Sequence, residues 1–242
     1  MATGYLRRGL FAGLVGGLVH GAYVAFVGNN LVAVAEGFEQ GHEHGGAAVS
    51  ELTTVAVSIG AGVAWGVLFG VLAFGIGYYL LEPVLPGREG TRSYLLGAVG
   101  FVTASGAPWL VLPPVAPGME QALPTETRIA WYLGMMALGA LACGGAVLAY
   151  RRLNERGRTV AAAAATLPFA LLAVAVALAP ANPVHGHLPA ALVATFRAVV
   201  VAGQLLLWGS LAAAHAWLVG RVDGTTPPLE TEPTADHAYG AD

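Results

Sequence analysis

The sequence has no lysine, a single cysteine (Cys143), and only 10% charged residues among its 242. One cysteine can form no internal disulfide and supplies no thiolate cluster, which excludes zinc fingers, iron–sulfur sites and dithiol redox motifs. A soluble domain carries about 25% charged residues, whereas this chain is 56% hydrophobic. The composition is therefore that of an integral membrane protein.

Several catalytic patterns are also missing. The chain contains no G-x-x-x-x-G-K-[ST] phosphate-binding motif, no G-x-S-x-G and no H-E-x-x-H. We therefore expect a protein that is not an enzyme, has no permanently bound cofactor and has no nucleic-acid partner.

Long apolar runs predict an all-α fold, because a membrane-spanning helix needs roughly 20 apolar residues. Six runs qualify, which predicts a polytopic helix bundle of about six transmembrane helices within residues 1–221. The spans are expected at residues 9–34, 55–81, 94–112, 129–150, 159–179 and 192–219. Residues 222–242 are acidic and proline-containing without any basic residue, so we expect a disordered tail.

Arginine placement orients these spans. Arginines precede the first span, separate the second from the third and the fourth from the fifth, and follow the sixth: Arg7, Arg8, Arg88, Arg92, Arg151, Arg152, Arg156, Arg158 and Arg221. Cytoplasmic loops carry such an excess of basic residues. The pattern predicts a multi-pass protein with both termini in the cytoplasm, and we expect it in the cell membrane of a prokaryote.

The first span has a second interpretation. Arg7 and Arg8, an apolar run and Ala33-Val34-Ala35 resemble a secretory signal with its cleavage site. The apolar run of residues 9–34 is much longer than the 7–15 residues typical of a signal peptide, so we favour an uncleaved span.

Glycine spacing predicts how two spans pack. Glycines recur every fourth residue in the first span and again in the second: Gly9, Gly13, Gly17 and Gly21, then Gly62, Gly66 and Gly70. Small residues at this spacing allow two helix backbones to approach closely. A docking groove for a partner helix is the alternative. Pro108 and Pro168 are expected to kink the third and fifth spans.

Two histidine pairs are the candidate metal ligands. His42-Glu43-His44 follows the first span, with Glu39 shortly before it. Imidazole and carboxylate together suit cobalt, nickel, zinc and copper(II), and alternate residues of an extended segment point the same way. The predicted ligands in this loop are His42, His44, Glu39 and Glu43, and the alternative is an ordinary polar loop.

The second pair is His185 and His187, between the fifth and sixth spans. The arginine pattern places both histidine loops on the outer side, independently of the histidines. The pairs are expected to share one ion or to form two successive weak sites. Met119 and Glu120, in the third outer loop, are weaker candidates for further ligands.

Polar residues at membrane depth are functional candidates by default. His20, Asn29 and Asn30 in the first span, with Gln204 in the sixth, predict an ion path inward from the outer loops. Hydrogen bonding within the bundle is the alternative. A haem held by His20 and His215 is a further possibility, but their expected depths differ by roughly 11 Å, whereas two axial ligands should be nearly level.

The chain resembles the CbtA family of probable cobalt transporter subunits. The resemblance rests on the acidic, histidine-bearing segment 36–44, on Leu-Pro-Pro-Val-Ala-Pro-Gly at residues 112–118, and on Arg128 before Trp131 and Tyr132. Family members have a histidine after a proline near the end of the fifth span, whereas here Ala181 follows Pro180 and the histidines come later. The resemblance covers the chain to about Arg221.

The resemblance implies a role in cobalt and cobalamin supply, together with a small, single-span, histidine-rich partner subunit. We therefore expect an integral membrane subunit of a divalent-metal uptake system, with Co2+ as its cargo. The ligand types equally accept Ni2+ or Zn2+. The alternative is a structural or partner-binding subunit without its own transport activity. The lipid bilayer surrounds the chain, and a homo-oligomer is compatible with the sequence.

Overall fold

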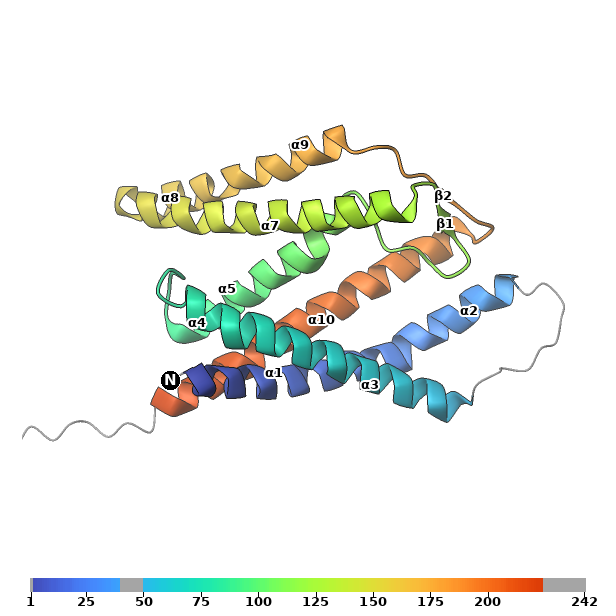
Figure 1. The fold of residues 1–242 in the computed structure, drawn as a ribbon, viewed down its shortest axis with the longest axis horizontal. Helices are drawn as coiled ribbons and strands as arrows, with labels where there is room; N and C mark the ends of the chain where they lie inside the picture. The colour runs from blue at the N-terminus through green and yellow to red at the C-terminus, as the bar shows by residue number, and fades with distance from the viewer. Residues whose placement is uncertain (1, 40–49, 224–242) are drawn as a thin grey trace, which may run out of the picture.

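The computed structural model describes residues 2–39 and 50–223, which form an elongated helix bundle (Figure 1). The α-helices are α1 Ala2–Tyr23, α2 Asn29–Glu39, α3 Glu51–Phe69, α4 Tyr78–Leu81, α5 Glu89–Phe101, α6 Ala107–Trp109, α7 Thr125–Leu153, α8 Arg158–Thr166, α9 Ala170–Leu178 and α10 Ala190–Asp223. Two short strands, β1 Glu120–Gln121 and β2 Val184–His185, pair in antiparallel fashion.

Short helical segments of other types join these helices into longer rods. Three are π-helical, η1 Val24–Gly28, η2 Gly70–Gly77 and η3 Val102–Gly106, and two are 3₁₀, η4 Asn154–Arg156 and η5 Leu167–Phe169. The η1, η2 and η3 segments connect α1 to α2, α3 to α4, and α5 to α6. Single π-helical turns inside α-helices are rare and occur frequently at functional sites.

The prediction of an all-α membrane bundle is confirmed. Among the described residues, five helices are long and apolar enough to cross a membrane: Ala2–Phe38, Glu51–Leu81, Thr125–Arg156, Arg158–Leu178 and Ala190–Arg221. The predicted third span, 94–112, corresponds to the rod from Glu89 to Trp109. This rod is not among the five, because its first turns carry Glu89 and Arg92 and its remainder includes further polar residues.

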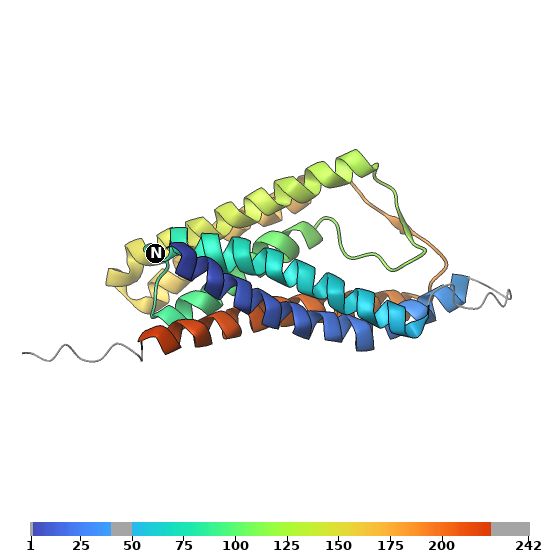
Figure 2. The same cartoon turned by 60° about the horizontal axis from the view of Figure 1, so that its bottom comes forward.

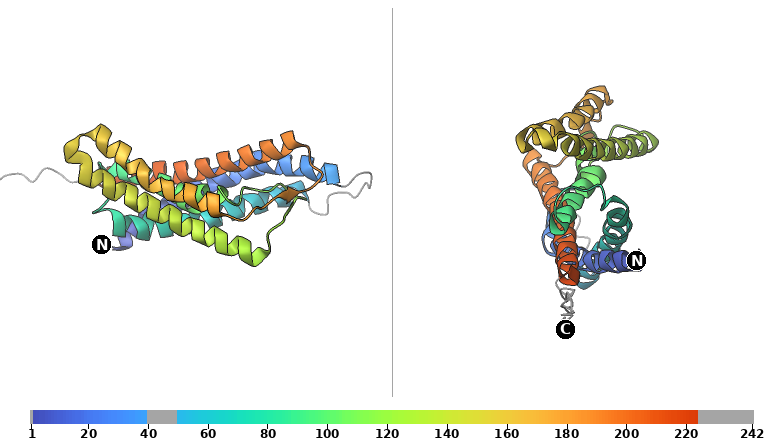
Figure 3. Two further views of the ribbon diagram at one scale, coloured as in Figure 1. Left: turned by 90° about the horizontal axis from the view of Figure 1, so that it is seen from above. Right: turned by 90° about the vertical axis from the view of Figure 1, so that its left-hand side faces the viewer.

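The rods fall into two groups with α5 between them. Viewed along the bundle axis, α7, α8 and α9 lie on one side and α1, α3 and α10 on the other (Figure 3). The outer surface of the bundle carries large apolar side chains. Leu178, Leu167 and Leu52, for example, are 75%, 70% and 79% exposed. A helix bundle that is apolar on its outside as well as inside is suited to lipid.

The loops gather at two ends of the bundle. The start of α1, the α4–α5 turn, the α7–α8 turn and the end of α10 lie at one end, which we call the arginine end (Figure 1). The end of α2, the start of α3, the β1–β2 pair and the start of α10 lie at the other, which we call the histidine end. The loops that the arginine pattern assigned to one side of the membrane therefore do lie together.

The α1 and α3 helices lie side by side (Figure 2) and meet through glycines, whose spacing predicted close helix packing. A methyl group added at Gly17 would lie 2.7 Å from Gly62 O, and one added at Gly13 would lie 2.6 Å from Gly66 O. These glycines contact backbone of the same chain, so they form internal packing and leave no groove for a partner.

Pro108 has a clear structural consequence. A proline inside a helix has no N–H to donate, so the carbonyl four residues earlier loses its usual partner. That carbonyl belongs to Ala104, and the Tyr132 hydroxyl of α7 donates to it at 2.6 Å. Pro168 lies in the 3₁₀ turn η5, where Gly145 of α7 passes close to its ring. Both prolines thus mark places where α7 contacts an interrupted helix.

Candidate functional site

At the histidine end, the short β1–β2 ladder joins two loops that are distant in sequence. Glu120 pairs with His185, and Gln121 pairs with Val184. Asn182 extends the contact, because its Oδ1 accepts from Leu123 N at 3.2 Å and its Nδ2 donates to Gln121 Oε1 at 2.9 Å. The loop that carries the second histidine pair is therefore fixed against the loop that precedes α7.

The strand register brings a carboxylate beside an imidazole. Residues directly opposite in an antiparallel pair project from the same face with Cβ atoms about 4.5–5.5 Å apart. Glu120 and His185 are such a pair, and both are exposed. Met119 also lies against Gly186, since a methyl group added there would be 2.8 Å from Met119 Cγ. The sequence marked Met119 and Glu120 only as weaker candidates, because the register that pairs Glu120 with His185 joins two distant loops and leaves no local signal.

His187 lies beside the end of α2. A cavity of about 250 Å³ is lined by Phe38, Gly118, His187 and Leu188. Phe38 lies one residue before the last described residue of α2. The predicted ligands His42, Glu43 and His44, and the Glu39 side chain, lie outside the described residues. Within residues 2–38 and 50–221, no group of three or more His, Cys, Asp or Glu side chains could hold a metal ion.

Midway along the bundle, polar groups converge on residues 199–204 of α10. His20 Nδ1 lies 2.9 Å from Gly203 O, and the Tyr23 hydroxyl donates to Val199 O at 3.1 Å. A carbonyl oxygen only accepts, so the His20 proton lies on Nδ1 and its Nε2 keeps an unshared electron pair. This is the arrangement in which histidines commonly bind metals.

The other residues of the predicted ion path point elsewhere. Gln204 Oε1 accepts from Ser105 in η3 at 3.2 Å. Asn29 bonds Ser58 of α3 at 2.9 Å, and Asn30 donates to Phe26 O of its own helix at 2.8 Å. His20 and Gln204 therefore share a level of α10, whereas the two asparagines face α3 and the helix exterior. The four residues do not form one continuous line.

An apolar layer fills the bundle between residues 199–204 of α10 and the arginine end. Its buried side chains come from η2, α5 and α10: Phe74, Leu96, Leu207, Trp208 and Leu211. The Trp208 ring lies directly against Gly100 of α5, which has no side chain to hinder it. In this structure the polar groups at 199–204 are thus separated from the arginine end.

Arg197, near the start of α10, has a backbone partner. Its Nε donates to Pro114 O at 3.3 Å. The proline-rich loop supplies this accepting carbonyl, and its prolines at 113, 114 and 117 have no N–H that could donate to it.

The haem interpretation loses its geometric basis. His20 lies beside Gly203, and His215 follows twelve residues later on the same helix α10. At 1.5 Å per residue these levels differ by about 18 Å, more than the sequence suggested. Each imidazole also has its own partner, Gly203 O for His20 and Ser93 for His215.

These features define a polytopic membrane protein with paired imidazole and carboxylate groups at one end and a polar level inside a closed bundle. A family model matches residues 2–220, and the chain belongs to that family, CbtA, described as a probable cobalt transporter subunit. No curated protein and no solved structure shows significant similarity to the chain. The protein is accordingly a multi-pass subunit of the prokaryotic cell membrane, in a family associated with cobalt transport.

Proposed function

We propose that this chain captures a divalent transition-metal cation, cobalt in the first instance, at the histidine end and admits it into the bundle. The observation that carries the proposal is the β1–β2 register, which places Glu120 opposite His185 while His187 lies beside the end of α2. Imidazole with carboxylate is a ligand set that cobalt, nickel and zinc accept.

The remaining ligands would come from the loop that follows α2. Each residue of an extended chain spans at most about 3.6 Å, so His42 lies within about 11 Å of the Glu39 Cα. His42, His44, Glu43 and Glu39 then complete a site that His185, His187 and Glu120 begin. Because the described residues alone contain no three-ligand group, the proposal requires both loops.

Passage through the bundle would begin at the unshared pair of His20, beside Gly203 and Gln204. We assign the arginine end to the cytoplasm on the basis of the positive-inside rule. A divalent cation entering from the histidine end would then gain roughly 4–5 kcal/mol from a potential of 100 mV, negative inside. The apolar layer around Trp208 must open for the ion to leave.

The partner in this proposal is a small single-span subunit with its own histidine-rich segment, which would add ligands at the same end. A purely structural role is the second candidate, favoured by one observation. Gly134 and Gly144 of α7 have no atoms within 4 Å of where a side chain would begin. Open glycines on the outside of a membrane helix permit close contact with another helix.

Cobalt binding and uptake by the assembled transporter test the proposal. The double variant His185→Ala/His187→Ala and the double variant His42→Ala/His44→Ala should each lower Co2+ affinity at least about tenfold, equivalent to about 1.4 kcal/mol. Glu120→Gln should weaken binding less, and Glu126→Gln is its matched control, an exposed carboxylate at the start of α7. Unchanged cobalt uptake by both double variants, with the complex intact, would favour the structural role.

A further inference from the structure

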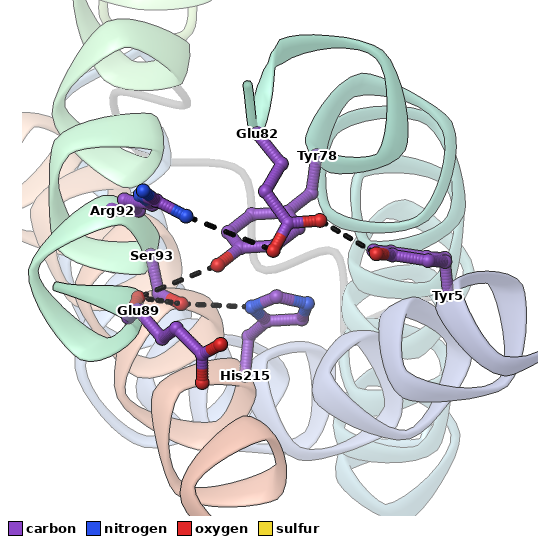
Figure 4. A network of polar contacts seen from close by, with 7 residues as sticks. All are labelled: Tyr5, Tyr78, Glu82, Glu89, Arg92, Ser93 and His215. Atoms are coloured by element: carbon purple, nitrogen blue, oxygen red, sulfur yellow. Dashed lines mark hydrogen bonds and ion pairs between the residues drawn. The ribbon is translucent and has the colours of Figure 1, made fainter. Parts of the chain in front are cut away.

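His215 is a fully buried histidine that the proposed metal path does not use. It lies on α10 near the arginine end with 0% of its surface exposed. Its Nδ1 lies 2.9 Å from Ser93 Oγ of α5, so it bridges the α5–α10 interface (Figure 4). The Tyr78 and Phe74 rings flank the imidazole, with centroid distances of 4.6 and 5.3 Å.

The hydrogen bonds fix which nitrogen carries the proton. Ser93 Oγ donates to Glu89 O at 3.3 Å, and the Tyr78 hydroxyl donates to the same carbonyl at 3.5 Å. Since the one hydroxyl proton of Ser93 is used there, His215 Nδ1–H must donate to Ser93 Oγ. The other nitrogen, Nε2, then holds an unshared pair, and it is buried without any hydrogen-bond partner.

An unpartnered buried acceptor costs about 1–3 kcal/mol, so this nitrogen is suited to a positively charged or donating ligand. A transition metal would need several further ligands, and the described residues contain no group of three that could supply them. The aromatic walls offer none either. A proton needs only the single electron pair of Nε2, so the chemistry favours a proton.

Ionisable groups surround the imidazole on every neighbouring element. The Tyr5 hydroxyl donates to Glu82 Oε2 at 2.6 Å, and Glu82 Oε1 lies 3.8 Å from Arg92 Nη1. Glu82 and Arg92 are 24% and 28% exposed, so water at the arginine end reaches this outer layer. The groups are Tyr5 and Arg8 on α1, Tyr78 on α4, Glu82 after α4, and Glu89 and Arg92 on α5.

We propose that His215 is a proton-binding site and that its protonation separates α5 from α10. A proton from water at the arginine end forms an N–H bond with the Nε2 pair, and no electron is transferred to another group. The resulting imidazolium would lie between the Tyr78 and Phe74 rings with no acceptor within hydrogen-bond distance of its new N–H, which is unfavourable in the closed interface. The proton therefore binds more tightly to an arrangement in which α5 and α10 have parted and water enters.

The sign of the pH dependence follows by linkage. The closed interface binds fewer protons than the open one, so its stability is greatest at high pH and decreases as the pH falls. The apolar layer around Trp208 lies in the same interface. If this interface opens, metal can leave at the arginine end, and this consequence rests on the proposed function. The proton site does not depend on the proposed function.

A distance measurement between α5 and α10 tests the site. In the full chain with Cys143→Ala, spin labels at Tyr94→Cys and Gly220→Cys occupy exposed positions on the two helices. Lowering the pH from about 8 to about 5, the range in which histidines change charge, should shift the distances in a lipid nanodisc toward longer values. His215→Asn should abolish the shift, because an amide N–H can still bond Ser93 but cannot take up a proton.

His237→Asn is the matched control, because it makes the same substitution at a histidine that belongs to neither the proposed metal site nor the helices α5 and α10, and it should behave like the parent. An absent shift in the parent, or the same shift in His215→Asn, would overturn the proposal. Cobalt uptake by the complete transporter in vesicles forms a second arm. If the α5–α10 distance depends on pH but no cobalt is taken up at any pH, the proton site stands and the transport role is refuted. If cobalt is taken up but the distance does not depend on pH, the transport role stands and the proton site is refuted.

Discussion

The α1–α3 and α5–α10 interfaces hold the same bundle together by different means. Between α1 and α3, glycine faces glycine, and backbone touches backbone along Gly13, Gly17, Gly62 and Gly66. Between α5 and α10, large side chains fill the space, with Trp208 lying on Gly100 and His215 bonded to Ser93. The first interface contains no titratable group in these contacts, whereas the second contains a buried imidazole.

The difference indicates which interface can rearrange. Backbone atoms in direct contact cannot move without displacing a whole helix, so the α1–α3 pair behaves as one rigid unit. Side chains can change rotamer, and a protonated histidine can change the balance of an interface. We therefore assign any opening of the bundle to α5 and α10.

The largest effect should come from Gly66→Ala in α3. The new methyl group would collide with Gly17 Cα, a backbone atom that has nowhere to move. We expect a loss of at least about 3 kcal/mol in the free energy of unfolding, at the upper end of overpacking effects, measured as a fall in melting temperature in detergent. Gly60→Ala on the same helix is the control, because nothing lies within 4 Å of its methyl position. Equal stability of the two variants would contradict the rigid-pair interpretation.

A smaller effect is expected from Gly100→Ala in α5. Its methyl group would meet the far edge of the Trp208 ring, a side chain that can adjust. We expect about 1–3 kcal/mol of destabilisation, less than for Gly66→Ala in the same melting experiment. Gly209→Ala on α10, with open space around it, should change little. If Gly100→Ala proved as costly as Gly66→Ala, the two interfaces would be equally rigid.

The smallest effect belongs to Ser93→Ala, which removes the hydrogen bond to His215 and leaves its Nδ1–H unpaired. Leaving a buried donor unpaired costs about 1–3 kcal/mol, and we expect a fall in melting temperature at the lower end of this range, since no neighbouring group has to move. Ser210→Ala is the control, since its hydroxyl bonds only carbonyls of its own helix, Leu206 O at 2.7 Å and Leu207 O at 3.1 Å. Equal stability of the Ser93→Ala and Ser210→Ala variants would mean that the Ser93–His215 contact adds nothing to the interface.

Much of the fold could be predicted from local patterns. Apolar runs located the long helices, and the glycine spacing correctly predicted close packing, although only the structure shows that α1 and α3 pack on each other. The helices extend beyond the predicted membrane spans. The α10 helix continues to Asp223, beyond the predicted end at residue 219, and the rod from Glu89 begins before its apolar segment. Helix ends depend on hydrogen bonds and caps more than on hydropathy.

The candidate site was predictable only in part. The histidine pairs were visible in the sequence, but the pairing of Glu120 with His185 depends on strand register between two loops. The role of His215 was similarly hidden, because its partners Ser93 and Tyr78 lie more than 100 residues away. A polar residue in a membrane span is costly in lipid, which the sequence makes evident. Which residue becomes its hydrogen-bond partner depends on how the helices pack.

The sequence by itself determined that this chain is a membrane helix bundle, which of its loops lie together at one end, and which helices carry a glycine face suited to close packing. These follow from hydropathy, charge and spacing, which act over a few turns of one helix. Only the tertiary structure decided that Glu120 faces His185, that Tyr132 compensates for Pro108, and that His215 is buried with one nitrogen unpaired. Such contacts join atoms distant along the chain, and their geometry exists only once the helices have packed.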